Sequence, residues 1–205
     1  MTTTRICFVR HGETDWNIEQ RMQGHIDLAL NALGQAQAAA LGRHYFSPGS
    51  AAALYSSDLI RARQTAQPIA EVLRLPVRLD PALRERHFGR CEGLTLAEVA
   101  AQHSEDAQAF ASRDPDYAVP GGGESRHQHQ SRVLDCIARL ASAHRGQTIV
   151  IVTHGGVLDV IYRHARGLPP DAPRDYPIPN AGINWVLAGS AAWQIESWGE
   201  TAHLG

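Results

Sequence analysis

Two histidines occupy equivalent places in the sequence, each just after a short apolar run and each followed by glycine. Residues 6–9 lead to His11, and residues 149–152 lead to His154. Apolar runs of this length without alternation are typical of strands that are buried on both faces. Open α/β sheets bind ligands at the carboxyl ends of their strands. If the two strands are neighbours, His11 and His154 face each other across one pocket.

The residues beside these histidines predict a site for an anion. Gly12 and Gly155 allow backbone N–H groups to approach a ligand closely, and helices that start there would favour negative charge. Arg10 directly precedes His11, and Arg61 lies in the first helical turn after a further strand. Taken singly, Arg10 could form a salt bridge at the end of its strand, and Arg61 could be a solvated arginine on a helix. Together with two imidazoles they predict a pocket for a dianionic phosphate, whose oxygens match the forked donors of arginine.

Five segments, in the same order, resemble the motifs of the histidine phosphatase superfamily, which includes the cofactor-dependent phosphoglycerate mutases. The matches extend from Arg5 to about Asn184, nearly the whole chain. The segments are Arg10–Thr14, Ser57–Ala66, Leu83–Gly93, Pro120–Ser125 and Thr153–Gly156. The resemblance implies a phosphoglycerate mutase-like fold, in which residues 1–205 form a single three-layer α/β/α domain with a mostly parallel central sheet.

The resemblance also implies catalytic roles for five residues. His11 resembles the nucleophile that takes the phosphoryl group, and it must be neutral with one free ring nitrogen. Arg10, Arg61 and His154 resemble the groups that hold the phosphate oxygens and stabilise their charge. Glu85 resembles the general acid that protonates the leaving oxygen and then takes a proton from the attacking water.

Further residues match positions around the phosphate in the family. Asn17, Gln23 and Gly24 match residues that border the phosphate pocket, and the backbone of Gly155 is expected to approach the ligand. Two interpretations of Arg86 remain open, because it could bind a substrate carboxylate or be an exposed loop arginine.

The rest of the sequence predicts the elements that position these residues. Strands alternate with helices, a pattern that favours an α/β fold with a mostly parallel sheet. Further strands are expected at 54–55, 77–79, 183–187 and 192–198, the last two paired near a sheet edge, and helices at 33–45, 62–73, 133–141 and 157–164. The stretch 112–125, with prolines and three glycines, and the proline-rich stretch 168–179 are predicted to be surface loops, the first near a binding site.

The composition of the chain limits the classes of partner that we expect it to bind. The chain has 205 residues, a formal net charge of -2 and 43% hydrophobic residues, without a basic stripe or a run of 18 apolar residues. A small phosphate ester is therefore a better candidate partner than a nucleic acid or a membrane. Three cysteines with no evident pairing, and an N-terminus without signal-peptide zones, predict a cytoplasmic location. The oligomeric state is left open between a monomer and a homodimer.

The sequence predicts no metal site and no required cofactor. His127 and His129 are two residues apart, a spacing that does not place side chains on one face of a helix. Cysteine spacing typical of zinc sites is missing as well. The family is normally less histidine-rich over His127–Gln130, and the sequence offers no account of this stretch. Only a mutase would require 2,3-bisphosphoglycerate.

Three functions are compatible with these motifs. A phosphatase and a phosphoglycerate mutase share every catalytic residue, but true mutases carry a longer insertion with extra lysine and arginine after the acidic segment. Here the corresponding stretch, Leu94–Gly123, is short and has Arg113 as its one arginine, with no lysine. This favours a phosphatase, with the mutase as the alternative. A non-catalytic binder of phosphate esters ranks third, since such relatives usually lose the nucleophile or the acid.

Overall fold

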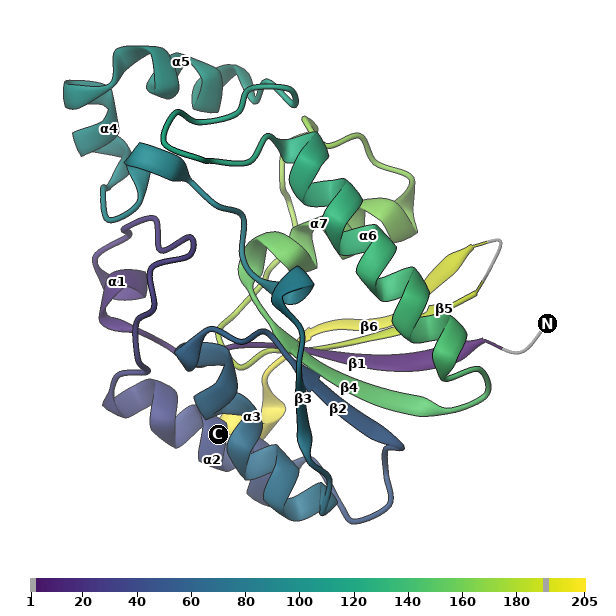
Figure 1. The fold of residues 1–205 in the computed structure, drawn as a ribbon. Coiled ribbons are helices and arrows are strands. Elements are labelled where there is room, and N and C mark those ends of the chain that lie inside the picture. The colour runs from purple at the N-terminus through teal and green to yellow at the C-terminus, as the bar shows by residue number, and fades with distance from the viewer. Residues whose placement is uncertain (1–2, 190–191) are drawn as a thin grey trace.

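A six-stranded sheet forms the centre of the computed structural model, which describes residues 3–189 and 192–205 (Figure 1). Its strands are β1 (Thr4–Arg10), β2 (Ala53–Ser56), β3 (Val77–Leu79), β4 (Thr148–Thr153), β5 (Ile183–Ala188) and β6 (Trp193–Glu200). Their order is β3-β2-β4-β1-β5-β6. The first four in this order run parallel, and β5 and β6 add an antiparallel edge. All six strands were expected from the sequence, and the mostly parallel sheet is confirmed.

The two central strands, β1 and β4, are buried on both faces, which explains why their sequences do not alternate. Alternate side chains of each strand reach opposite layers. One face carries Ile6, Phe8, Ile149 and Ile151, and the other carries Cys7, Val9, Val150 and Val152.

Helices cover both faces of the sheet, so the predicted three-layer architecture is confirmed (Figure 1). On one face lie α2 (Ala32–His44) and α3 (Ile60–Leu73), and on the other lie α6 (Arg126–Ala143) and α7 (Gly155–Arg166). Leu41 and Ile69 pack in the first layer, and Ile137 and Leu158 in the second, all fully buried. These are the four helices that the sequence predicts.

Three short helices, α1 (Asp15–Ile18), α4 (Leu96–Gln102) and α5 (Ser104–Ser112), were not predicted. They are too short for a periodic apolar stripe, but α4 begins with a capping box in which Thr95 and Glu98 each bond the other's backbone N–H. That sequence signature was overlooked. In Figure 1, α4 and α5 lie apart from the layered body. Cys91, Val99 and Val119 form a small apolar cluster there.

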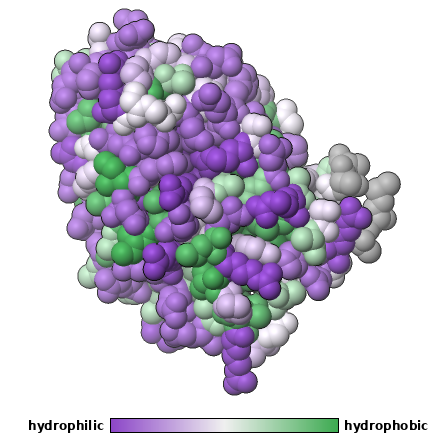
Figure 2. Space-filling view, in the orientation of Figure 1, coloured by the Kyte–Doolittle hydropathy of each residue, from purple (hydrophilic) through white to green (hydrophobic). Residues whose placement is uncertain are grey.

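The two predicted loops lie outside regular structure, except that Ser112 ends α5. Among the described residues, no helix is both long and apolar enough to cross a membrane. The face in Figure 2 is mostly hydrophilic, and its hydrophobic side chains form small separate patches. Most large apolar side chains instead pack in the two layers beside the sheet.

Arg132 ties α6 both to Glu124, just before the helix, and to the loop that carries Glu85. The Arg132 guanidinium donates two hydrogen bonds of 2.7 Å to the Glu124 carboxylate. Its remaining N–H groups donate to the backbone carbonyls of Ala82, Arg84 and Glu85 at 2.9 to 3.1 Å. Burial alone would raise the pKa of Glu124, but Arg132 and the His87 N–H outweigh it and lower that pKa to about 2. The charged carboxylate therefore stabilises this loop.

We predict that Glu124→Gln destabilises the protein at neutral pH by roughly 2 kcal/mol, after allowance for solvent screening. The folded pKa lies below the ordinary value of 4.5, so the contribution is complete above that pH and is lost as pH falls toward 2. Urea unfolding of wild type and variant between pH 7 and pH 2.5 measures the difference, which should shrink with acid. Glu105→Gln, at an exposed carboxylate in α5, is the control. A difference that does not depend on pH would contradict the assignment.

Candidate active site

The two histidines meet because β1 and β4 are adjacent and in register. Arg10 pairs with Thr153 at the ends of the strands, and the His11 N–H donates to the Thr153 carbonyl at 2.9 Å. The rings of His11 and His154 consequently lie with their centroids 5.2 Å apart. This juxtaposition is the one that the sequence predicts for neighbouring strands.

The His11 ring has one nitrogen engaged and one free. Its Nδ1 lies 2.7 Å from the Gly12 carbonyl. A carbonyl only accepts, so Nδ1 carries the hydrogen and Nε2 keeps its lone pair. Burial, and then the positive charges of Arg61 and Arg10, hold the pKa of His11 well below its ordinary value. His11 is thus a neutral imidazole with an available nitrogen, as a nucleophile requires.

His154 is fully buried beside it and is held by a residue that the sequence analysis did not single out. Its Nε2 lies 2.8 Å from the Ser57 hydroxyl, which also accepts the Leu59 N–H at 3.3 Å. Its Nδ1 has no partner within residues 3–189 and 192–205. Burial, followed by Arg61 and His11, lowers the pKa of His154 as well. If Ser57 donates to Nε2, the hydrogen resides on Nδ1 and can be donated to a ligand.

Two guanidinium groups, from the fully buried Arg61 and the half-buried Arg10, face the histidines without a carboxylate partner in the described chain. Arg61 is fully buried and donates to the carbonyls of Gly24 and Ile26 at 2.8 and 2.9 Å. Arg10 donates one bond to the Ile178 carbonyl. Burial is the main cause that lowers the pKa of each to about 10, so both remain charged at neutral pH. Uncompensated charge of this kind favours an anionic ligand.

Glu85 is fixed through both carboxylate oxygens. Oε1 accepts the Arg86 N–H and Oε2 accepts the Gly156 N–H, each at 2.8 Å. A Cβ on Gly156 would lie 2.1 Å from Oε1, so only glycine allows this approach. The sequence analysis expected such a close approach by the glycines after His154, but to a ligand. In the structure, Gly156 receives the proposed acid instead.

A helix begins directly after His154 but not directly after His11. The long helix α7 begins at Gly155, directly after His154, as expected. No helix begins at Gly12, because α1 starts only at Asp15 and has four residues. The favourable field of a long helix start is therefore present only beside His154, and the chain after His11 is held by Asn180, whose side-chain N–H donates to the His11 carbonyl at 3.0 Å.

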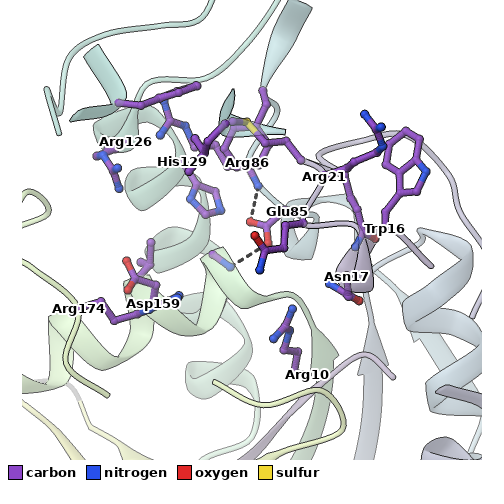
Figure 3. Close-up of a pocket in the computed structure, with 18 of the residues that line it drawn as sticks. Arg10, Trp16, Asn17, Arg21, Glu85, Arg86, Arg126, His129, Asp159 and Arg174 are labelled. Atoms are coloured by element: carbon purple, nitrogen blue, oxygen red, sulfur yellow. Dashed lines mark hydrogen bonds between the residues drawn. The ribbon is translucent and has the colours of Figure 1, made fainter. Parts of the chain in front are cut away.

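Most of these groups line one cavity of about 690 Å³ (Figure 3). Seven of the ten candidate site residues line it: Arg10, His11, Asn17, Gln23, Arg61, Glu85 and Arg86. The other three, His154, Gly24 and Gly155, do not. Gly24 instead supplies the carbonyl that holds Arg61, and Gly155 lies against the Arg10 side chain.

Arg86 is not an exposed loop residue, which removes one of its two interpretations. Only 6% of it is exposed, and its Nε donates to the Glu124 carbonyl at 2.8 Å. The remaining face of the guanidinium lines the cavity near Glu85 (Figure 3).

Comparison with known proteins gives a consistent result. The family model for the histidine phosphatase superfamily, branch 1, matches residues 6–201. The chain is 40% identical over 201 residues to phosphoglycerate mutase-like protein 4 of Arabidopsis thaliana, which covers 97% of this chain and 86% of that protein. It is 40% identical over 202 residues to the metal-independent phosphoserine phosphatase of the same plant, covering 98% and 83%.

A solved structure shares the fold as well. The phosphoserine phosphatase of Entamoeba histolytica, in complex with 3-phosphoglyceric acid, has a TM-score of 0.86 and 27% identity, covering 98% of this chain and all of that one. With the ordered motifs, the three-layer fold and the family match over nearly its whole length, the chain belongs to the histidine phosphatase superfamily.

Proposed function

We propose that this protein is a phosphomonoester phosphatase that hydrolyses a small phosphorylated metabolite through a phosphohistidine at His11. The observation that carries the proposal is a neutral, buried His11 with a free Nε2 next to two unpaired guanidinium groups. The relatives named phosphoserine phosphatase support a small phosphate ester as the substrate.

The first half-reaction transfers the phosphoryl group to the protein. Arg10, Arg61 and the free Nδ1 of His154 hold the phosphate oxygens, a role of positioning and charge stabilisation. The lone pair of His11 Nε2 forms the bond to phosphorus as the bond to the ester oxygen breaks. Glu85 in its acid form gives that oxygen a proton, so the alcohol leaves neutral.

The second half-reaction restores the protein. Water attacks phospho-His11 and Glu85 takes its proton, which releases inorganic phosphate and leaves His11 neutral. Both steps use only protein groups and water, so no metal or cofactor is part of the scheme. A relative named as metal-independent supports this.

Hydrolysis is proposed in preference to mutase activity because the segment 94–123 brings little positive charge to the cavity. The segment 94–123 forms α4, α5 and a loop, and Arg113 is the one cation that it places at the cavity. A bisphosphate intermediate is then retained weakly, and water competes well for phospho-His11. Phosphoglycerate mutase remains the second candidate, supported by the mutase-like relative and by further arginines that other segments bring to the cavity.

We also propose that residues 1–205 form a single domain that works in the cytoplasm. One sheet with a core on each face supports the first part. The three cysteines are buried and free, as expected in a reducing compartment.

The covalent intermediate is directly testable. Rapid quenching with 32P-labelled ester should leave label on the wild-type protein that is stable to base and labile to acid. His11→Ala should carry no label and lose at least about 10³-fold in kcat, because no other group can take the nucleophile's role. A His11→Ala variant with near-normal turnover would remove His11 from the mechanism.

The contact between Gly156 and Glu85 predicts a second result. Gly156→Ala should push the Glu85 carboxylate aside, because the new Cβ would lie 2.1 Å from Oε1. The change should slow alkyl phosphates by about 10²-fold or more, and aryl phosphates, whose alcohols leave without a proton, much less. Glu85→Gln should show the same pattern.

Gly155→Ala is the matched control, since its Cβ would lie 3.5 Å from Arg10 Nε, an ordinary contact that leaves Glu85 in place. Thermal unfolding checks that each variant is folded. Equal losses on alkyl and aryl esters in Gly156→Ala would argue that Glu85 is structural.

The choice between phosphatase and mutase is decided by the fate of phospho-His11. With 3-phosphoglycerate and catalytic 2,3-bisphosphoglycerate, we expect slow formation of 2-phosphoglycerate, together with phosphate release from a panel of esters. Coupled assays for both products measure the ratio. Fast isomerisation with little free phosphate would make the protein a mutase.

A further inference from the structure

The histidine-rich start of α6 divides into an outer and an inner residue. His127 is exposed, and its Nδ1 lies 2.8 Å from the Asp116 carboxylate. His129 lines the active-site cavity, is 3% exposed, and has an Nε2 with no partner among the residues described. Burial is the main cause that lowers the pKa of His129 to about 4. His129 thus presents a neutral imidazole with an unused polar atom to the ligand.

The charges that line the cavity are strongly unbalanced. Eight of the lining residues are arginines and only two, Glu85 and Asp159, are carboxylates. Arg10 and Arg61 serve the phosphate, Arg21 pairs with Glu19 and Glu98, and Arg163 pairs with Asp159. The other four have no ion pair within the described chain: Arg86, Arg113, Arg126 and Arg174.

Two of these four arginines lie with His129 on one wall. Figure 3 shows Arg86, His129 and Arg126 beyond Glu85, on the side away from Arg10. Burial and then the neighbouring charge of Arg126 lower the pKa of Arg86 to about 10, and burial and Arg113 lower the pKa of Arg126. Like charges that gather at a cavity wall without a counter-ion are stabilised by a bound anion.

The position of this wall relative to Glu85 decides which part of a substrate it meets. Glu85 faces the oxygen of the leaving alcohol in the proposed mechanism, so the alcohol part extends past Glu85. His129 is close enough to Glu85 and Arg86 for their charges to act on its ring. The cavity of about 690 Å³ is of a size that holds a whole small metabolite rather than a phosphate alone.

We propose that His129, Arg86 and Arg126 form a second anion-binding subsite, which receives an acidic group of the leaving alcohol. The preferred substrate is then a phosphate monoester that bears a second anionic group, a carboxylate or another phosphate. The inference rests on the proposed phosphatase function and adds the substrate class to it.

Matched ester pairs test the subsite and identify the acidic group. O-Phosphoserine and O-phosphoethanolamine differ only in a carboxylate, and propane-1,3-diol bisphosphate and its monophosphate differ only in a phosphate. For at least one pair, wild type should show a kcat/KM about 10-fold or more in favour of the acidic member, the size of one charge-assisted hydrogen bond. p-Nitrophenyl phosphate, which lacks the second anion, reports the shared chemistry.

Three variants test the proposed subsite without changing the groups that bind the phosphate. His129→Ala and Arg126→Ala should each lower the preference about 10-fold, while the activity on p-nitrophenyl phosphate stays within about threefold. Arg126→Lys should keep part of the preference. His127→Ala, on the exposed face of the same helix, is the control and should change neither value.

The outcomes distinguish a failure of the proposed subsite from a failure of the proposed phosphatase function. Loss of preference in the carboxylate pair supports the subsite and assigns a carboxylate, and loss in the bisphosphate pair supports it and assigns a phosphate. A wild-type ratio near one in both pairs, or a ratio that neither variant changes, overturns the subsite and leaves the phosphatase intact. No phosphate release from any ester overturns the phosphatase and the subsite with it. If His129→Ala does not fold, Arg126→Ala, at a half-buried side chain, decides alone.

Discussion

The enclosure of two arginine charges, one fully buried and one half-buried, without a carboxylate ion pair is the constraint on which the rest of the site depends. Arg10 and Arg61 are held by backbone carbonyls, which fix their direction but do not cancel their charge. Their field contributes to keeping both His11 and His154 neutral. A protonated His11 could not act as a nucleophile, so in the proposed mechanism the charges that attract the phosphate also keep its attacking group neutral.

The two unpaired arginines also limit where a carboxylate can lie in the cavity. Among the residues that line the cavity, the Glu85 carboxylate is held by two backbone N–H groups instead of pairing with Arg10 or Arg61. A direct ion pair would neutralise one of these guanidinium groups. Gly156 and the Arg132–Glu124 pair hold Glu85 and its loop in place, which leaves both cations available for the phosphate in the proposed mechanism. Backbone hydrogen bonds, more than attraction between side chains, therefore keep Glu85 apart from Arg10 and Arg61.

The sequence predicted the parts of the fold that depend on local patterns. The apolar runs of β1 and β4 and the stripes of α3 and α6 are readable because periodicity reports burial directly. The juxtaposition of His11 and His154 was predicted from strand ends, and motifs pointed to Arg61 and Glu85. Two other contacts between distant segments were not predictable. Glu85 meets Gly156, 71 residues away, and Ser57 meets His154, 97 residues away, and no local signal encodes either meeting.

The same division explains why the motifs reveal the reaction but not the substrate. The phosphate end of the cavity is built at the ends of β1 and β4 and at the start of α3, elements whose packing in the core leaves them little freedom. The far end is lined by Arg86, by Arg126 and His129 at the start of α6, and by loop residues such as Arg113 and Arg174, which can change without disturbing the sheet. In the proposed mechanism, chemistry is therefore tied to the fold, whereas the proposed recognition of the leaving alcohol depends on the side chains of Arg86, Arg126 and His129.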